Sequence, residues 1–525
     1  MKWPSSMGQP CDASAICSPG SAPWILAATI LGSSMAFIDG TVVNLALPAL
    51  QADLGATVTA MQWVVESYAL LLTSIMLVGG SLGDIYGRKR TFMAGVVVFA
   101  AASAWCGLAS SVSVLIAARC LQGIGGALLI PGSLAILGAS FHESERGKAI
   151  GTWSGFTSIT AAAGPVLGGF LIEHASWRWA FFINLPIALA VLAITIRHIP
   201  ESRNEKAPAT LDWPGALLVT IGLGGLVYAL IESAKRPWSD PGLIAATLLG
   251  LSALAVFIAV EFYSRAPILP LGLFRSQTFR GVNLLTLFMY GALSGLLFFF
   301  PLNLIQVQRY SATAAGAAML PFILLMFLLS RWSGGLVDRY GARRPLVIGP
   351  IIVATGFALY ALPGIGGDYW TTYFPAAMIL GAGLAISVAP LTTTVMNSVS
   401  AELSGTVSGI NNAVSRLAGL LAIAVLGVVM FAVFNRNLAS GLSEPGIDSE
   451  IRLEIESQRE KLAAIEIPQH IESEQRAKIR KTIDESFLAG FRIVMIIASA
   501  LALLSGVIAW LSIKRTQNPG PTTSV

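Results

Sequence analysis

Charged side chains interrupt several long apolar stretches of this sequence, among them Asp39, Glu66 and Arg119. A charge in such surroundings is costly, so each of these residues is a candidate for function. A carboxylate can take up and release a proton. Burial favours its protonated form, whereas a nearby arginine, which stays charged at any working pH, favours the carboxylate. These residue types predict a proton-coupling site in which Asp39 pairs with Arg119 in one conformation and loses its partner in another, with Glu66 as a further proton-binding group. The alternative is a static buried pair that keeps Asp39 charged in every state.

A second polar group falls on the apolar stretch 405–434, where Asn411, Asn412 and Arg416 lie close together. Arg416 is too far from either end of that stretch to extend easily to the lipid headgroups. We therefore expect these three side chains to face protein or a water-filled cavity.

Several other kinds of chemistry are excluded by the motifs. The sequence has no GxxxxGK[ST] phosphate loop, so an ATP-driven pump built on this chain alone is excluded. It also has no HExxH motif, the pattern of a zinc-dependent protease. Gly79–Gly83 matches the GxSxG nucleophile pattern, but no strand is expected before it. The four cysteines are too scattered for a disulfide framework or a zinc site. We expect a protein that is not an enzyme, has no cofactor or metal, and draws its energy from an ion gradient.

The composition indicates that a membrane surrounds these residues. Of 525 residues, 55% are hydrophobic and only 12% are charged, and the mean hydropathy is +0.72. Soluble proteins carry about 25% charged residues, so a soluble enzyme is excluded. The net charge of +5 does not require nucleic acid, because basic clusters beside membrane spans set orientation. The expected partners are the lipid bilayer, protons and a small-molecule substrate.

Apolar stretches of about 20 residues, the length that crosses a bilayer, recur along the chain and predict fourteen transmembrane helices. They are 24–47, 62–82, 91–110, 112–137, 149–172, 179–199, 213–232, 242–262, 282–306, 314–337, 345–363, 372–395, 405–434 and 489–513.

The orientation follows from Lys and Arg, which concentrate in alternate connections. This distribution predicts a multi-pass protein of the cytoplasmic (inner) membrane with both termini in the cytoplasm. Asp39 and Arg119 would then lie about 11 to 12 Å below the outer surface. Glu66 would lie about 6 Å deep, at the outer mouth, where it stays hydrated.

One connection on the outer side, residues 435–488, is long and carries charges of both signs. Opposite charges four residues apart, as in Glu472 with Arg476 and Lys481 with Glu485, support exposed helices. We expect a solvated helical hairpin outside the membrane. The alternative is a docking surface for a periplasmic partner.

A motif after the second span returns after the tenth, as an Asp, a Gly three residues later and then basic residues. The copies are Gly80-Ser-Leu-Gly-Asp84-Ile-Tyr-Gly87-Arg88 and Asp338-Arg339-Tyr-Gly341-Ala-Arg343. An aspartate at the end of a helix faces the negative end of the helix dipole and needs a cation or another helix amino terminus as partner. The repeat favours a gating loop that latches two halves together. The alternative is that the basic residues only anchor the chain to the membrane surface.

The distance between the copies predicts two six-helix halves with two helices inserted between them. The expected parts are an N-terminal tail (1–23), an N-terminal bundle (24–200), two inserted helices with their linkers (201–280), a C-terminal bundle that includes 435–488 (281–513), and a C-terminal tail (514–525).

The predicted fifth span carries glycines at a spacing of four, at Gly164 and Gly168, with Gly169 beside them. This spacing lets helices approach closely. Pro165 removes a backbone donor and bends the helix, which suits a hinge. Close packing without a hinge is the alternative.

These motifs give the chain a family resemblance. GSLGDIYGRKR resembles the loop motif of the major facilitator superfamily of secondary transporters, and four further stretches resemble its fourteen-helix drug:proton antiporter branch: FIDGTVVNLALP, ARCLQGIGGA, AGPVLGGFL and WRWAFFINLPIA. The resemblance implies the major facilitator fold and, for the glycines of the fifth span, a hinge that seals one state against leak. It also implies proton-coupled efflux of hydrophobic small molecules, including antibiotics, by alternating access. Two alternatives stay open: a dedicated exporter of one endogenous metabolite, and a membrane sensor or scaffold that transports nothing.

Overall fold

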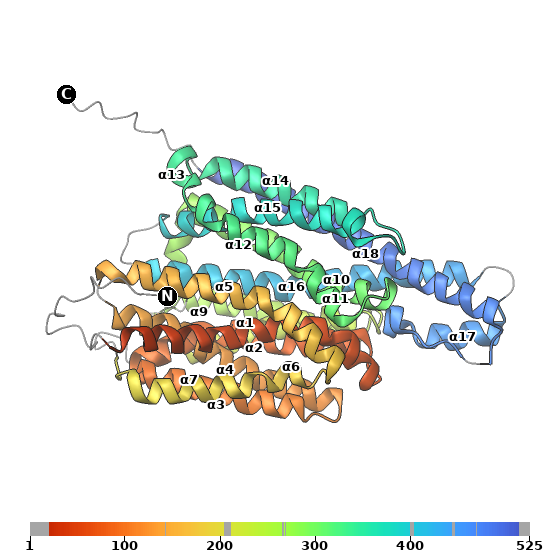
Figure 1. Cartoon of the computed structure of the whole chain (residues 1–525), viewed down its shortest axis with the longest axis horizontal. Helices are drawn as coiled ribbons and strands as arrows, with labels where there is room; N and C mark the ends of the chain where they lie inside the picture. The colour runs from red at the N-terminus through yellow and green to blue at the C-terminus, as the bar shows by residue number, and fades with distance from the viewer. Residues whose placement is uncertain are drawn as a thin grey trace. The chain divides into compact units, whose positions relative to one another are not determined.

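The computed structural model describes residues 20–141, 143–203, 212–264, 267, 269–398, 404–443, 447–468 and 470–513, and over these ranges the chain forms helices and no β-strand. The long helices are α1 (Ala22–Asp53), α2 (Val58–Tyr86), α3 (Arg88–Gly107), α4 (Val112–Ser140), α5 (Glu143–His174), α7 (Asn184–His198), α8 (Trp213–Glu232), α9 (Pro241–Tyr263), α10 (Gln277–Leu302), α12 (Leu320–Gly334), α14 (Arg343–Tyr360), α15 (Tyr369–Met396), α16 (Ser404–Leu442) and α18 (Ser473–Ser512), as labelled in part in Figure 1.

Each predicted span falls on one of these long helices. By length and apolar composition, twelve helices within the described ranges can cross a membrane, and α5 and α14 are the two long helices outside that set. The all-helical membrane fold is therefore confirmed, whereas the count of fourteen spans stays a prediction. Shorter elements are α6 (Trp179–Phe182), η1 (Leu271–Arg275), η2 (Asn303–Val307), α11 (Ala312–Ala318), α13 (Leu336–Tyr340), α17 (Ser449–Ser457) and η4 (Arg459–Ala464).

Local sequence sets several helix boundaries. Ser111, Ser276 and Ser311 precede α4, α10 and α11, and each side chain accepts a hydrogen bond from a backbone N–H of the first turn. Such capping satisfies donors that have no partner inside the helix. Pro301, near the end of α10, supplies no N–H, and the chain continues there as the π-helical turn η2.

The chain divides into two compact units. Unit 1 comprises Met1–Ala46, Trp63–Gly224 and Leu249–Ile268, and unit 2 comprises Leu47–Gln62, Gly225–Leu248 and Leu269–Val525. The ends of α1 and α2 that meet at residues 47–62 thus group with unit 2. The two inserted helices, α8 and α9, are divided between the units.

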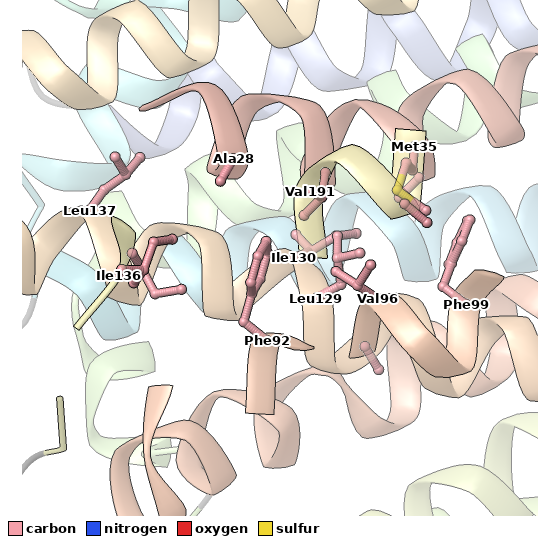
Figure 2. Packing of buried hydrophobic residues seen from close by; sticks show 14 of the residues in the cluster. Ala28, Met35, Phe92, Val96, Phe99, Leu129, Ile130, Ile136, Leu137 and Val191 are labelled. Atoms are coloured by element: carbon pink, nitrogen blue, oxygen red, sulfur yellow. The ribbon is translucent and has the colours of Figure 1, made fainter. Parts of the chain in front are cut away.

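The core of unit 1 is built by α1, α3, α4 and α7. Figure 2 shows Met35, Phe92, Phe99, Leu129 and Val191 turned toward one another from these helices, and all five are buried. The glycines of α3 and α4 allow the close approach. A Cβ on Gly125 would lie 2.5 Å from the backbone nitrogen of Phe99, and one on Gly95 would lie 2.8 Å from that of Leu129. This packing fixes α4, which carries Arg119.

In unit 2, α14 packs against α15, and α10 and α16 pack against α18. A Cβ on Gly356 would lie 2.8 Å from the backbone nitrogen of Leu380, so α14 and α15 meet backbone to backbone.

The predicted outer hairpin is shorter than 435–488. The helix α16 continues to Leu442, and α18 is one helix of 40 residues from Ser473 to Ser512. The second arm of the hairpin is therefore the start of the last span. Within the described residues between the two long helices, the helical elements are α17 and η4. In Figure 1, α17 lies beside the first part of α18. Several apolar side chains of the segment are buried, including Ile455, Leu462 and Ile483, whereas Leu453 is exposed.

Candidate functional site

The structure brings Asp39 and Arg119 together in unit 1. The Arg119 Nη1 lies 2.6 Å from Asp39 Oδ2, and the two side chains are 1% and 0% exposed, respectively. They come from the middle of α1 and from α4. This contact is a buried ion pair between two helices that are distant in sequence.

Further hydrogen bonds hold both members of the pair. Gln122 Nε2 donates to Asp39 Oδ1 at 2.8 Å, and Arg119 Nη1 donates to Gln122 Oε1 at 2.7 Å. Arg119 Nε donates to the carbonyl oxygen of Val64 at 3.0 Å, and its guanidinium lies 4.2 Å from the centre of the Tyr68 ring. A buried ion pair is tolerated when additional hydrogen bonds satisfy both charges, and this site meets that condition.

Gln122 is the member of this site that the sequence analysis missed. It lies three residues after Arg119 and therefore on the same face of α4. Its Nε2 also donates to the Ser103 hydroxyl, which in turn accepts from Asn184 Nδ2 on α7. The sequence does contain a signal for Gln122, because a polar amide three residues from Arg119 in an apolar span is placed to bond with the same charged partner.

Glu66 does not belong to this network. Its side chain is 0% exposed, and neither carboxylate oxygen has a hydrogen-bond partner. The expectation that Glu66 stays hydrated at the outer mouth is wrong, because packing on α2 encloses it completely.

The first copy of the repeated motif forms a tight turn between α2 and α3. Asp84 accepts hydrogen bonds from Arg88 Nε and Nη2 at 2.9 and 2.8 Å, so Arg88 is the cation that balances this aspartate. Gly87 has φ +110°, a backbone conformation that favours glycine. A Cβ on Gly80 would meet only Pro131 Cβ, at an ordinary contact distance of 3.6 Å.

Glu201, which follows α7, closes the same turn. Its carboxylate accepts hydrogen bonds from the backbone N–H groups of Lys89 and Arg90, at 3.0 and 3.2 Å. The backbone N–H of Arg88 donates to the carbonyl oxygen of Ser202 at 2.8 Å. An acidic side chain at a helix amino terminus satisfies free donors and complements the helix dipole.

The second copy of the motif lies between α13 and α14. Gly341 has φ +74°, so it occupies the same left-handed region as Gly87. The Arg343 guanidinium lies 5.3 Å from the centre of the Trp510 ring. The side chain of Asp338 lies outside the part of the chain that the structure describes.

The glycines of α5 lie against α1 within unit 1. A Cβ on Gly164 would collide with Thr41 Oγ1, and one on Gly168 would lie 2.6 Å from Val42 Cγ1. Pro165 and Gly169 are buried beside them. These residues therefore allow α5 to pack tightly on the helix that carries Asp39.

In the polar group on α16, Asn411 bonds to a neighbouring helix. Asn411 Nδ2 donates to Thr286 Oγ1 at 2.8 Å and to Asn283 Oδ1 at 3.2 Å, both on α10. Asn412 is exposed, and Arg416 is partly buried. Asn411 thus joins a polar contact between two helices of unit 2.

Long apolar helices that enclose a buried, hydrogen-bonded ion pair define a multi-pass membrane protein with an intramembrane charge site. The sequence model of a protein family, the Major Facilitator Superfamily, matches residues 29–423 of this chain. The chain therefore belongs to this superfamily of membrane transporters.

Relatives and solved structures agree with that assignment. Multidrug resistance protein Stp of Mycobacterium tuberculosis (strain CDC 1551 / Oshkosh) is 32% identical over 92% of this chain and 91% of that protein. The tetracenomycin C resistance and export protein of Streptomyces glaucescens is 32% identical over 93% of this chain and 91% of that protein. The structure of a bacterial homologue of the human lysosomal transporter Spinster is similar with a TM-score of 0.66 at 16% identity, covering 95% of this chain and 98% of that chain. That similarity confirms the major facilitator fold.

Proposed function

We propose that this chain is a proton-driven exporter of hydrophobic small molecules, cationic or neutral, that resides in the cytoplasmic membrane and is not an enzyme. The observation that carries the proposal is the buried Asp39–Arg119–Gln122 network. A charge site this deep in apolar helices needs a functional reason. The names of the relatives, which include multidrug resistance and antibiotic export, supply the substrate class.

In the proposed cycle Asp39 carries the proton. In the closed pair Arg119 and Gln122 donate hydrogen bonds to its two oxygens, so neither oxygen is free. Separation of α1 from α4 would remove both partners at once, and the buried acid would then bind a proton from the outer side. Return of the guanidinium would expel that proton toward the cytoplasm. Asp39 and Arg119 thus couple proton movement to a change in helix packing.

The remaining parts of the chain have proposed roles in the same cycle. Both termini lie in the cytoplasm, so the turn at Gly87 and the turn at Gly341 lie on the cytoplasmic side and act as gating loops. The contact of α5 with α1 through Gly164 and Gly168 seals the state in which the pair is closed. Substrate would enter a cavity near the membrane midplane, alternately open to each side.

The test is transport in proteoliposomes under an imposed pH gradient. Asp39→Asn keeps the size of the side chain and removes its proton-dependent charge. We expect the variant to bind substrate without accumulating it, and the accumulation ratio to fall to the passive value. Normal accumulation by Asp39→Asn at the wild-type rate would refute the assignment.

A dedicated exporter of one metabolite is the second candidate. It is favoured by relatives named for single compounds, such as the probable actinorhodin transporter of Streptomyces coelicolor (strain ATCC BAA-471 / A3(2) / M145), 31% identical over 81% of this chain and 75% of that protein. A panel of unrelated drugs in cells that lack other exporters separates the two: protection against several drugs supports the broad exporter, and protection against one or none supports the dedicated one.

A further inference from the structure

The short element η4 is the point where side chains from three other parts of unit 2 meet. Gln51, near the end of α1, donates from Nε2 to the carbonyl oxygen of Lys461 at 3.0 Å. Lys235, in the turn between α8 and α9, lies 3.6 Å from the carboxylate of Glu460. Arg480 of α18 donates to one carbonyl oxygen of η4 and to that of the residue after it. The element η4 is therefore bonded to the first helix, to the inserted helices and to the last helix.

Gln51 is clamped between two elements of unit 2. Its side chain is buried, and the whole residue is 2% exposed. Its Oε1 accepts a hydrogen bond from Gln306 Nε2 of η2 at 2.9 Å, while its Nε2 donates to η4. Both polar ends of this buried amide are used, and a buried amide that loses its partners is costly. These two contacts hold the end of α1 in unit 2.

The end of α1 can move separately from the rest of that helix. Residues 22–46 of α1 belong to unit 1, whereas residues 47–53 group with unit 2. Pro48 lies just after this boundary and supplies no backbone N–H to the helix. A proline inside a helix is a common place for it to bend. The part of α1 that carries Asp39 is thus joined to the part that carries Gln51 at a site that can bend.

The segment that contains η4 has the features of a body that can detach as a whole. The side-chain amide of Gln458 donates to the backbone of Glu466 and accepts from it, at 3.1 and 3.2 Å, so residues 458–466 are closed on themselves. Leu462 is 0% exposed and has φ +51°. This conformation is unfavourable for a residue with a side chain and persists only where the surroundings hold it. The backbone of the segment can therefore relax when its contacts break.

We propose that residues 458–466 form an outer latch, which covers the end of α1 and must leave Gln51 and Lys235 before that end can separate from unit 2. The proposal rests on the proposed function, because in the proposed orientation the latch acts on an outer side that opens and closes. Arg480 is the pivot, since it ties the latch to α18. Release breaks the hydrogen bond from Gln51 and the ion pair of Glu460. The alternative is that the same contacts form a permanent support.

The strength of the contacts suits a latch that opens and closes. The side chains of Lys235 and Glu460 are 32% and 29% exposed, and an ion pair this open to water contributes little to stability. A neutral hydrogen bond such as that of Gln51 also makes a modest net contribution. Together these contacts are small against the stability of a folded domain, so the outer latch can open while the long helices stay folded.

The first experiment measures opening of the outer latch in intact cells. A membrane-impermeant maleimide is applied from outside, and its rate of attachment to Ala463→Cys in the full-length chain is followed against the chain without this substitution. Ala463 is 1% exposed, so the reagent reaches it only when the latch opens. We expect labelling at least tenfold faster than that of Ala315→Cys, which replaces a 0% exposed alanine of α11. Adding Gln51→Ala to Ala463→Cys should raise the rate at least fivefold further.

Gln277→Ala is the matched control for Gln51→Ala. Gln277 likewise donates from Nε2 to a backbone carbonyl oxygen, that of Leu511, at 3.3 Å, but it lies at the end of α10 that is remote from η2. We expect it to leave the labelling of Ala463→Cys unchanged. If Ala463→Cys does not reach the membrane, hydrogen exchange at residues 458–466 compares the two glutamine variants without a cysteine. Equal effects of the two variants would overturn the inference, as would labelling of Ala463→Cys no faster than that of Ala315→Cys.

The second experiment tests whether release of the outer latch is needed for transport. Lys235→Cys with Glu460→Cys places two thiols at the ion pair, and a short bifunctional methanethiosulfonate joins them until a reducing agent is added. We expect ethidium efflux from loaded cells to fall at least tenfold on cross-linking and to return on reduction. Cross-linking Arg452→Cys with Glu456→Cys, the ion pair within α17, should leave efflux unchanged. The wild-type chain treated with the same reagent shows any effect of the native cysteines.

A permanent support predicts the opposite result, because joining two residues that never separate changes nothing. Unchanged efflux after residues 235 and 460 are cross-linked would therefore overturn the role of the outer latch in transport. The latch and the proposed function can also fail separately. If Ala463→Cys is labelled as expected but the wild type exports no ethidium, the proposed export of such compounds fails while the opening of the latch stands.

Discussion

Glu201 lies directly over Gly87: a Cβ added to Gly87 would come within 2.6 Å of the Glu201 Oε1. The same carboxylate accepts hydrogen bonds from two backbone N–H groups at the start of α3. The absence of a side chain at residue 87 therefore lets an acid from the end of the sixth predicted span cap the third. Glu201, which lies outside the repeated motif, thus stabilises the first copy of that motif.

The cap can be tested with Glu201→Ala. Loss of a capping side chain costs about 1 kcal/mol, so the amides of Lys89 and Arg90 should exchange with solvent roughly fivefold faster. Hydrogen exchange read by mass spectrometry on peptides that cover the start of α3 measures this effect. Exchange in α10 serves as the internal control, because it belongs to unit 2 and should not change. Unchanged exchange at residues 89 and 90 would show that Glu201 does not stabilise the turn.

Gly87→Ala should destabilise the protein for two reasons. The positive φ of this residue is unfavourable for alanine, and the new Cβ would displace the Glu201 carboxylate. A loss of about 1 to 2 kcal/mol is expected for a strained residue of this kind, measured as a lower thermal unfolding temperature in detergent.

Gly138→Ala is the matched control for that substitution. Gly138 lies within α4, and a Cβ there would meet nothing within 4 Å. Alanine is the better helix former, so this variant should be neutral or slightly more stable. Equal losses from both substitutions would contradict the role given to the left-handed turn.

The ion pair predicts strong coupling between substitutions at Asp39 and Arg119. Arg119→Gln alone leaves a buried carboxylate without its cation, and breaking a buried pair in this way costs about 3 to 5 kcal/mol. Asp39→Asn added to Arg119→Gln removes the stranded charge, so the double variant should be more stable than Arg119→Gln alone. Thermal unfolding of the two single variants and the double variant in detergent gives the coupling.

Additive losses would show that the two side chains do not depend on each other. The double variant should in any case be inactive in gradient-driven transport, because it has no titratable group at residue 39. Stability and transport thus report on different properties of the same pair.

The ion pair could be predicted from the sequence because Asp39 and Arg119 are both charged residues inside apolar spans. A charge in that position is costly, so a partner of opposite charge is the natural expectation. The turns at Gly87 and Gly341 could also be predicted, because the motif with its Asp and Gly occurs twice. Both glycines have a positive φ in the structure. The role of Glu201 could not be predicted from the sequence, because it lies 112 residues from Lys89 in the chain. It also lies in a connection between spans, where a charged residue is expected to face water.

The predicted bounds of the outer segment, 435–488, are too wide, because α16 continues to Leu442 and α18 begins at Ser473. The regular spacing of charged residues there drew attention away from the apolar residues between them. Arg480 lies four residues before Asp484, a spacing that also predicts an exposed helical face. In the structure its guanidinium donates hydrogen bonds to the carbonyl oxygens of Ala463 and Ile465, at 2.9 and 2.8 Å, and so ties α18 to η4. Isoleucines placed between the charged residues are buried beneath it, among them Ile479 and Ile483. A single sequence cannot distinguish a charge that caps carbonyl groups from one that faces water.

The glycines of α5 leave no room for a larger side chain beside α1. Gly164→Ala would place a methyl group against Thr41, and Gly168→Ala would place one 2.6 Å from Val42. Neither neighbour can retreat easily, because Val42 is buried on α1 and the Thr41 hydroxyl donates to the carbonyl oxygens of Phe37 and Ile38.

If this contact seals the closed state, pushing α5 away from α1 should let protons leak. We expect Gly164→Ala proteoliposomes to lose an imposed pH gradient faster than wild type in the absence of substrate, as followed with an internal pH dye. Gly151→Ala lies on the same helix, where an added Cβ meets nothing within 4 Å, and it should hold the gradient like wild type. A tight membrane with slow transport in Gly164→Ala would instead mean that the glycines only allow the helices to move past each other. The leak measurement therefore distinguishes a seal from a sliding surface, because only a seal predicts proton flux without substrate.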